Sequence, residues 1–156
     1  MSNPLIVGVD VHRKANAASF MDDQGHELAP RLAFDNNRPG TEAFAQHLAD
    51  LASNGNFDAI QIAVEATNWF WFLFLHAISQ HRALQERPLS LYAFNPRLTA
   101  NFKRTYSDLD HTDLNDAFVA ADRLRLGRDL PPPFRCDDIY LPIRFLTRYR
   151  YHVVRN

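Results

Sequence analysis

The chain opens with two short apolar runs separated by a polar turn. Residues 6–10 are apolar up to a final aspartate, residues 12–14 are basic, and residues 15–21 form the second run. Apolar runs of this length that flank a turn are typical of the two strands of a β-hairpin. We therefore expect the hairpin to hold the carboxylate of Asp10 at the rim of a buried sheet.

A third strand and a helix are predicted next. Residues 27–34 follow a turn sequence at 22–25 and can extend the hairpin into an antiparallel meander. Thr41 is then a candidate N-cap for an amphipathic helix, because apolar residues recur at helical spacing up to a stop at residues 54–56. This helix would cover one face of the sheet.

The same order of strand, acid and helix then returns. Residues 59–64 form an apolar run that ends before Glu65. Reached through a helical crossover, this strand would run parallel to the first one, so Asp10 and Glu65 would end neighbouring strands. A helix follows from residue 69 to about residue 82. Its aromatic side chains lie on all sides, which indicates a buried helix, although its tryptophans could instead stack on bases.

A basic helix is predicted after the next strand. Residues 90–94 read as that strand, and Asn95 is the N-cap of a helix with a proline in its first turn. Three cationic side chains on this helix, Arg97, Lys103 and Arg104, form a candidate patch for phosphate groups.

A further helix carries two acids at its start. Thr112 is a good N-cap, and an apolar stripe from residue 117 to residue 124 marks the inward face of the helix. Asp113 and Asp116 lie one turn before that stripe, so we expect both carboxylates to point toward the sheet edge. The acids of the loop at residues 106–111 are alternative candidates.

Glycine and proline then interrupt the pattern between residues 127 and 133, which predicts a boundary. We expect one domain over residues 1–130. Residues 131–156 would form a proline-rich linker and the first turns of a helix that begins near residue 141. Apolar residues at helical spacing among arginines are typical of a coiled coil, so we expect this helix to pair copies of the chain into a homo-oligomer.

Composition narrows the setting. A length of 156 residues with 46% hydrophobic residues suits one domain with a sizeable core. The 17 Lys and Arg nearly balance the 18 Asp and Glu, so nucleic acid would have to be met by local basic patches. The single Cys136 excludes an internal disulfide, and no Cys and His cluster has zinc-ligand spacing. Without a leader sequence or an apolar run of about 20 residues, we expect a cytoplasmic protein that does not cross a membrane.

Four acids are thus predicted to meet at one edge of an α/β sheet. Three antiparallel strands, then parallel strands with flanking helices, form the layout of the ribonuclease-H-like fold. Clustered carboxylates repel one another, and a pair of divalent cations relieves that repulsion while holding the attacking and leaving oxygens of a phosphodiester. Oxygen ligands favour Mg²⁺ or Mn²⁺ over zinc.

The motifs at these positions resemble a known family. Residues 8–10, 65–67, 95–96 and 112–117, in this order and at these separations, resemble the N-terminal, RuvC-like domain of the DEDD-type insertion-sequence transposases. That family includes related site-specific invertases, and the resemblance covers residues 5–126. It implies a tetrad of catalytic, metal-binding acids made of Asp10, Glu65, Asp113 and Asp116.

The resemblance also implies an activity and partners. It implies metal-dependent cleavage and transfer of DNA strands, within a longer protein in which a coiled coil and a domain with a serine nucleophile follow. Some members are guided by a structured RNA, which adds a guide RNA to DNA as a candidate partner. Two positions depart from the family pattern, His111 in place of a lysine and Asn68 in place of a glycine. Neither removes a metal ligand.

The basic residues and two rival functions stay open. The candidates for contact with nucleic acid are Arg13, Lys14, Arg97, Lys103 and Arg104. Ordinary solvated surfaces explain these positions as well. One rival function is a module that binds RNA or DNA through metal and dimerises without cutting. The other is half of an actin-like ATPase or sugar kinase, which would need a second glycine-rich phosphate loop that the sequence lacks.

Overall fold

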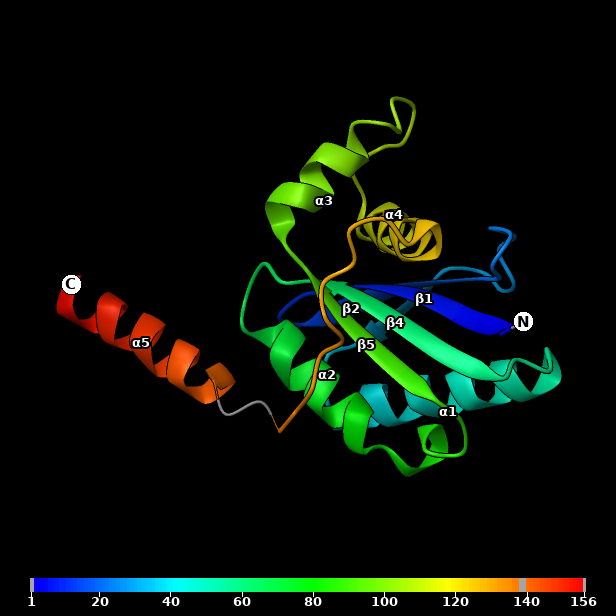
Figure 1. Cartoon of the computed structure of the whole chain (residues 1–156), viewed down its shortest axis with the longest axis horizontal. Helices are drawn as coiled ribbons and strands as arrows, with labels where there is room; N and C mark the ends of the chain where they lie inside the picture. The colour runs from blue at the N-terminus through cyan, green and yellow to red at the C-terminus, as the bar shows by residue number, and fades with distance from the viewer. Residues whose placement is uncertain (1, 138–139, 156) are drawn as a thin grey trace.

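A mixed five-stranded sheet lies at the centre of the molecule (Figure 1). A computed structural model describes residues 2–137 and 140–155. The sheet order is β3-β2-β1-β4-β5. The strands are β1 (Pro4–Val11), β2 (Ala15–Met21), β3 (Leu32–Asp35), β4 (Ala59–Glu65) and β5 (Leu89–Phe94). The first three pair antiparallel, whereas β4 and β5 run parallel to β1, which confirms the arrangement predicted from the sequence.

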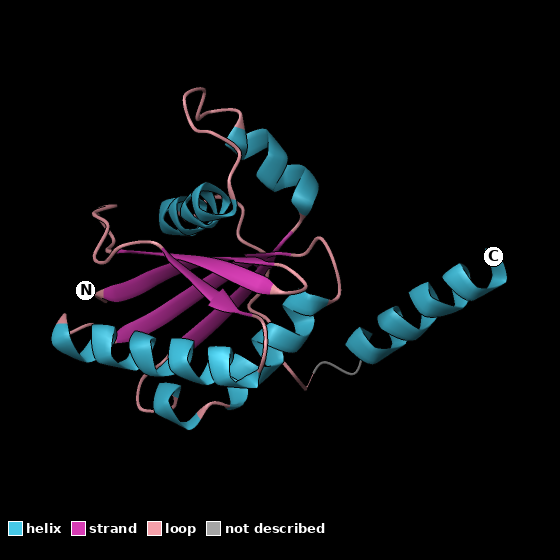
Figure 2. Ribbon diagram, turned by 180° about the vertical axis from the view of Figure 1, so that it is seen from behind, coloured by secondary structure: helices cyan, strands magenta, loops and turns pink. Residues whose placement is uncertain are grey.

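Helices cover both faces of this sheet (Figure 2). On one face lie α1 (Arg38–Asn54) and α2 (Phe70–Gln80), followed by a 3-10 turn at Arg82–Leu84. On the other face lie α3 (Pro96–Lys103) and α4 (Asp113–Leu126). A last helix, α5 (Tyr140–Arg155), extends away from the sheet. Within the described residues, none of the helices has the length and hydropathy needed to span a bilayer.

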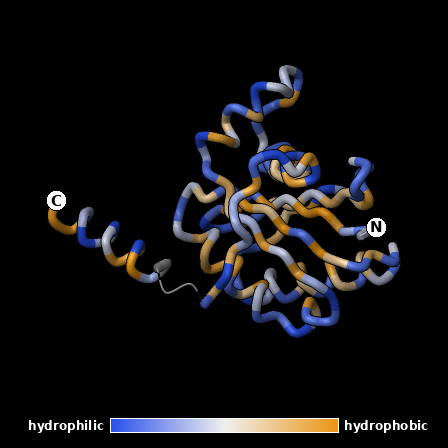
Figure 3. Tube along the Cα trace, viewed as in Figure 1, coloured by the Kyte–Doolittle hydropathy of each residue, from blue (hydrophilic) through white to orange (hydrophobic). Residues whose placement is uncertain are grey.

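Two apolar cores hold these layers together. The larger core lies between the sheet and the helices α1 and α2, where Phe44 stacks on Phe34 with ring centroids 4.3 Å apart. The smaller core lies under α4 and includes Met21, Phe94 and Leu124. Hydrophobic positions are dense along the central strands, whereas they alternate with polar ones along α5 (Figure 3). The aromatic side chains of α2 therefore serve mainly as core, and Trp71 is 8% exposed.

Helix α4 lies directly on β1 because Gly8 has no side chain. A Cβ atom at Gly8 would lie 2.0 Å from the carbonyl oxygen of Ala117 and 2.4 Å from the amide nitrogen of Ala121. Both atoms belong to the backbone of α4, so no side-chain rotation relieves the clash. The depth of α4 on the sheet is thus fixed at this position.

Both N-caps predicted for the later helices are confirmed. The Asn95 side chain accepts a hydrogen bond from the amide of Arg97 at the start of α3. The Thr112 hydroxyl accepts one from the amide of Asn115, so α4 begins at Asp113. Gly127, with a φ of 66°, ends α4 in the left-handed conformation.

Three predicted boundaries in the first half of the chain are wrong. The third strand covers only Leu32–Asp35, because Pro30 offers no amide to a ladder; Glu27 makes an isolated bridge with Met21 instead. Asn37, rather than Thr41, caps α1: its side chain accepts a hydrogen bond from the amide of Gly40, and Thr41 lies inside the helix.

The third of these boundaries is the end of α2. The helix ends at Gln80 instead of near Arg82, because His81 has extended backbone and its ring accepts a hydrogen bond from the amide of Ala83. Arg82 then opens the 3-10 turn. The earlier end of α2 does not affect the sheet edge where Glu65 ends β4, because Gln80 and Arg82 both lie at the other end of the helix.

The segment before α5 stays close to the domain. The amide of Phe134 donates a 2.6 Å hydrogen bond to the carbonyl oxygen of Leu91 in β5. Phe134 packs against the larger core, and so does Phe145 in α5 itself, whose ring centroid lies 4.4 Å from that of Trp69. Among the described side chains of α5, the large apolar ones that are exposed are Ile143, Leu146, Tyr149, Tyr151, Val153 and Val154. The domain boundary near residue 130 and oligomerisation through α5 stay predictions.

Candidate functional site

Two acids stand at the same edge of the sheet. Asp10 lies near the end of β1 and Glu65 ends β4. These strands are parallel and Val9 pairs with Val64, so Asp10 and Glu65 are the next residues in register. Their side chains are 13% and 17% exposed, respectively. Neighbouring parallel strands therefore bring two nearly buried carboxylates together.

The start of α4 brings two more acids to this edge. Asp113 and Asp116 lie in the first turn of the helix, whose N-terminal end favours negative charge. Asp113 is the more open of the two, with 68% of its side chain exposed, whereas Asp116 is 28% exposed. Because Gly8 sets the depth of α4 on β1, the same contact places these acids above the strand acids.

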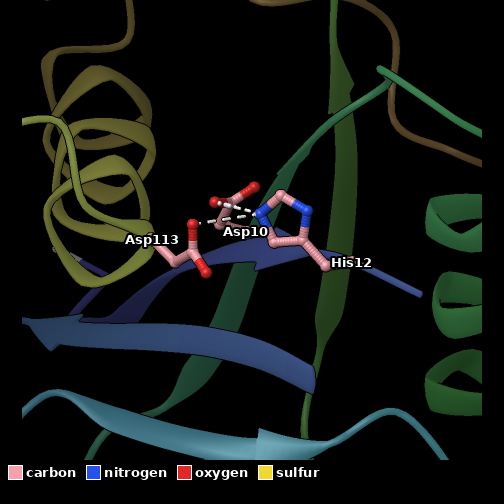
Figure 4. A group of neighbouring side chains, drawn as sticks. All are labelled: Asp10, His12 and Asp113. Atoms are coloured by element: carbon pink, nitrogen blue, oxygen red, sulfur yellow. Dashed lines mark hydrogen bonds and ion pairs between the residues drawn. The ribbon is translucent and has the colours of Figure 1, made fainter. Parts of the chain in front are cut away.

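The first half of the site consists of Asp10, His12 and Asp113 (Figure 4). The Nε2 atom of His12 lies 2.9 Å from Oδ2 of Asp10 and 3.3 Å from Oδ1 of Asp113. One ligand atom from each of the three residues lies within 4.8 Å of the others, a spacing that could hold a metal ion. Burial alone would lower the pKa of His12, but the two carboxylates outweigh it and hold that pKa above its ordinary value.

The second half consists of Glu65, Asp116 and Lys103. The Nζ atom of Lys103, at the end of α3, lies 3.4 Å from Oε2 of Glu65 and 3.2 Å from Oδ2 of Asp116. Burial would lower the pKa of Lys103, but the two carboxylates raise it above the ordinary value. Each half of the site thus pairs one strand acid with one helix acid across a basic side chain.

The two halves interact electrostatically. Burial is the main cause that raises the pKa of Asp10, and the charges of Asp116 and Asp113 raise it further against the opposing effect of His12. Burial is also the main cause that raises the pKa of Glu65, to which Asp10 and Asp116 add while Lys103 opposes. The acids are therefore close enough to destabilise one another's charged forms, which is the situation that a divalent cation relieves.

The remaining basic candidates lie around this edge. Arg13 and Lys14 are exposed in the turn between β1 and β2, and Arg97 and Arg104 are exposed on and just after α3. Lys103 differs from them, because its ammonium group contacts the acids. Of the five basic candidates, four are therefore exposed, and Lys103 lies inside the acidic cluster.

The alternative acids do not join the cluster. Asp108 and Asp110 are exposed in the loop before α4. The backbone carbonyl of Asp110 accepts hydrogen bonds from the amide of Thr112 and the side chain of Asn115, so this residue supports the start of α4 through its backbone. Asn68, the departure from the family pattern, donates to the carbonyl oxygen of Val11 and accepts from the amide of Phe70.

His12 is a possible metal ligand that the sequence analysis did not include among the candidates. In the sequence, His12 reads as part of a basic turn that could contact a phosphate or simply be solvated. The signal was present, because His12 comes two residues after Asp10, just beyond the end of β1, and residues two apart along a strand point to the same face of a sheet.

Arg31 ties the β2–β3 connection to the start of α4. Its guanidinium donates to the side chain of Asn115, makes a 2.7 Å hydrogen bond to Oε1 of Glu27, and lies 4.4 Å above the ring of Phe118. Asn115 stands between the two helix acids in the sequence. Arg31 therefore steadies the helix end that carries half of the acidic cluster.

We expect Arg31→Met to lower the free energy of unfolding by about 1 kcal/mol, the size of a partly exposed cation–π contact with its charged hydrogen bonds. Urea denaturation measures this change. The matched control is Arg38→Met, which removes the exposed ion pair with Glu42 on α1 and should change stability by about 0.5 kcal/mol or less. Equal losses in the two variants would show that Arg31 does not hold α4.

Comparisons with known proteins agree with this geometry. A family model described as a transposase, of the DEDD type and the IS110 group, matches residues 7–156. None of the curated proteins gives a significant match. Among solved structures, the chain is similar to Thermus thermophilus RuvC in complex with a Holliday junction substrate, with 11% identity and a TM-score of 0.58 over 86% of this chain and 100% of that one. A second Thermus thermophilus RuvC structure gives 11% identity and a TM-score of 0.53 over 83% and 99% of the two chains. These likenesses confirm the predicted RuvC-like fold.

Proposed function

Since this chain belongs to the DEDD transposase family of the IS110 group, we propose that its acidic sheet edge is a metal-dependent centre that cleaves and transfers DNA strands. The observation that carries this proposal is the convergence of four carboxylates from three separate elements, β1, β4 and α4, on one edge of a RuvC-like sheet. The proposed metal ligands are Asp10, Glu65, Asp113 and Asp116.

The donor set fits Mg²⁺ or Mn²⁺. The four acids offer only carboxylate oxygens, which are the ligands that these hard cations prefer. Burial of Asp10 and Glu65 leaves their charges poorly solvated, so a cation gains more at this edge than at an open surface. His12 adds a ring nitrogen beside Asp10 and Asp113, which is more compatible with Mn²⁺ than with Mg²⁺.

The protein groups would act by position and charge. A divalent metal pair, held by the four acids, would supply polarisation of the phosphate and stabilisation of the attacking and leaving oxygens. The strand acids are held by paired backbone, and the helix acids are held by the Thr112 cap and by the packing of α4 on Gly8. Asp113 and Asp116 lie in the first turn of α4, where the positive end of the helix dipole favours negative charge.

DNA would approach over the exposed basic residues. Arg97 and Arg104, on and just after α3, and Arg13 and Lys14, in the β1–β2 turn that follows Asp10, are all exposed. Cations at these places attract phosphates toward an otherwise acidic centre. The RuvC neighbour is described in complex with a Holliday junction, which supports branched DNA as the first substrate to try.

The finer assignments rest on the family resemblance. We propose that residues 1–130 are the catalytic domain of a cytoplasmic recombinase. By the same resemblance, a further domain of that recombinase would carry a serine nucleophile, and site-specific invertases would be its relatives. A guide RNA is a candidate second partner of the basic surface. The exposed apolar side chains of α5 favour a homo-oligomer through residues 131–156.

Calorimetric titration with Mn²⁺ tests the metal centre. We expect saturable binding by the wild type and at least about tenfold weaker binding by Asp10→Asn, because loss of a ligand costs at least as much as loss of a group that orients one. The control is Asp50→Asn, an exposed acid on α1 that should leave the affinity unchanged. Equal, weak responses from all three proteins, with and without DNA, would rule out this centre. Binding without any cleavage of branched DNA would instead support the non-cleaving module.

A further inference from the structure

Each half of the acidic cluster already contains a basic side chain. His12 bridges Asp10 and Asp113, and Lys103 bridges Glu65 and Asp116, with all four nitrogen–oxygen distances between 2.9 and 3.4 Å. The two halves are alike in this respect. The two bridging groups differ, however, in what they can do when a metal ion arrives.

Histidine can stay beside a metal ion, whereas lysine cannot. The neutral imidazole of His12 has a ring nitrogen with a lone pair, so it can become a ligand together with the two acids. The ammonium group of Lys103 has three donors and no acceptor, and it is positively charged. It can neither ligate a cation nor share the same two carboxylates with one at close range.

The position of Lys103 makes this conflict direct. Its Nζ atom lies 3.4 Å from Glu65 and 3.2 Å from Asp116, one acid from β4 and one from α4. A cation held jointly by these two carboxylates would lie in the same place, since its oxygen ligands would be about 2.0 to 2.6 Å away. Lys103 is 21% exposed and stands at the last residue of α3, so its side chain has open solvent on one side.

We propose that Lys103 is a resident counter-cation of the Glu65–Asp116 pair that a divalent metal ion displaces, and that the displaced ammonium group then binds a DNA phosphate. This inference rests on the proposed function, because it takes the four acids to be the metal centre. Before metal binds, the single positive charge of Lys103 offsets part of the repulsion between the two carboxylates. After metal binds, the ammonium group joins Arg97 and Arg104 on the α3 side and adds one cation to the face that meets DNA.

The displacement predicts an unusual effect of removing a side chain at the site. Lys103→Met keeps the length of the aliphatic stem and removes the charge, so the metal no longer competes with it. We expect the variant to bind Mn²⁺ about fivefold more tightly than the wild type, the gain that corresponds to one partly exposed ion pair. A lysine that merely supported the fold would give the opposite sign.

Calorimetry with Mn²⁺ on the full chain measures this effect. Arg38→Met is the matched control, because it takes the same charge from the exposed ion pair with Glu42 and should leave the affinity unchanged. Lys103→Gln is a second uncharged variant and should show the same tighter binding. It keeps the test valid if Met disturbs the packing. Unchanged or weaker Mn²⁺ binding by both Lys103 variants, while the wild type binds normally, would overturn the displacement. Absence of binding by the wild type would instead reject the metal centre itself.

The second half of the proposal needs a DNA measurement. Fluorescence anisotropy with a short single-stranded oligonucleotide gives affinities in Ca²⁺, which takes the same oxygen ligands, and in a chelator. We expect Lys103→Met to weaken DNA binding about threefold in Ca²⁺ and to leave it nearly unchanged in the chelator, in line with one phosphate contact made only after displacement. Equal losses under both conditions would show that Lys103 meets DNA independently of the metal.

Discussion

Gly8→Ala should lower the free energy of unfolding by about 2 to 3 kcal/mol, the range for an overpacked core position without room to adjust. The added Cβ atom would lie 2.0 Å and 2.4 Å from two backbone atoms of α4, at Ala117 and Ala121. Since backbone in a regular helix cannot rotate out of the way, α4 as a whole must move off β1. Urea denaturation measures the loss.

The same substitution should damage the proposed metal centre. Bringing the contact with Ala117 from 2.0 Å to an allowed 3.0 Å requires a shift of about one ångström, and Asp113 and Asp116 would move with the helix. Metal–oxygen distances of about 2.0 to 2.6 Å leave little room for such a shift. We expect Mn²⁺ affinity to fall at least about tenfold, as for loss of a supporting group, under conditions in which the variant is still folded.

Gly127→Ala provides a control of similar type on the same helix. Gly127 has a φ of 66° and nothing within 4 Å of an added Cβ, so alanine there costs about 1 to 2 kcal/mol through backbone strain alone. It stands at the far end of α4 from the acids. We expect it to reduce stability and to leave Mn²⁺ affinity unchanged. Wild-type stability and affinity in Gly8→Ala would contradict the close packing of α4 on β1.

The sheet edge was predictable because local signals and topology agree. Asp10 and Glu65 each follow an apolar run, and a helical crossover between two strands brings both ends to the same edge. Thr112 marked the start of α4, so the phase of Asp113 and Asp116 relative to the buried stripe followed from helical periodicity. These inferences need only short stretches of sequence and the general rule for parallel connections.

The basic side chains within the site were not predictable in the same way. Lys103 reads as one of several cations on a helix, and only the three-dimensional packing of α3 beside α4 shows that its ammonium group contacts acids from two other elements. The partner of Arg31 lies 84 residues away at Asn115, so no local pattern announces it. The errors at the third strand and at the α1 cap have a simpler cause. The predictions followed the longer apolar patterns of these segments, whereas Pro30 and Asn37 set the actual boundaries.

Asp113→Asn and Asp116→Asn should each reduce cleavage of a synthetic four-way DNA junction by at least about a hundredfold, comparable to the loss of one charge-stabilising group from an active site. The two residues belong to different halves of the cluster, Asp113 with His12 and Asp116 with Lys103. If each half holds its own cation, the reaction needs both halves at once. Cleavage rates in Mg²⁺ and in Mn²⁺ measure the losses.

The double variant distinguishes one centre from two independent sites. Groups that act as a unit give strongly non-additive losses, so Asp113→Asn with Asp116→Asn should be little slower than either single variant. Asp110→Asn is the control, because this exposed loop acid supports α4 only through its backbone carbonyl, which the substitution keeps. A large loss in Asp110→Asn with a small one in Asp113→Asn would move the ligand role to the loop. Losses that multiply in the double variant would mean that the two helix acids contribute separately and that the cluster does not work as one metal centre.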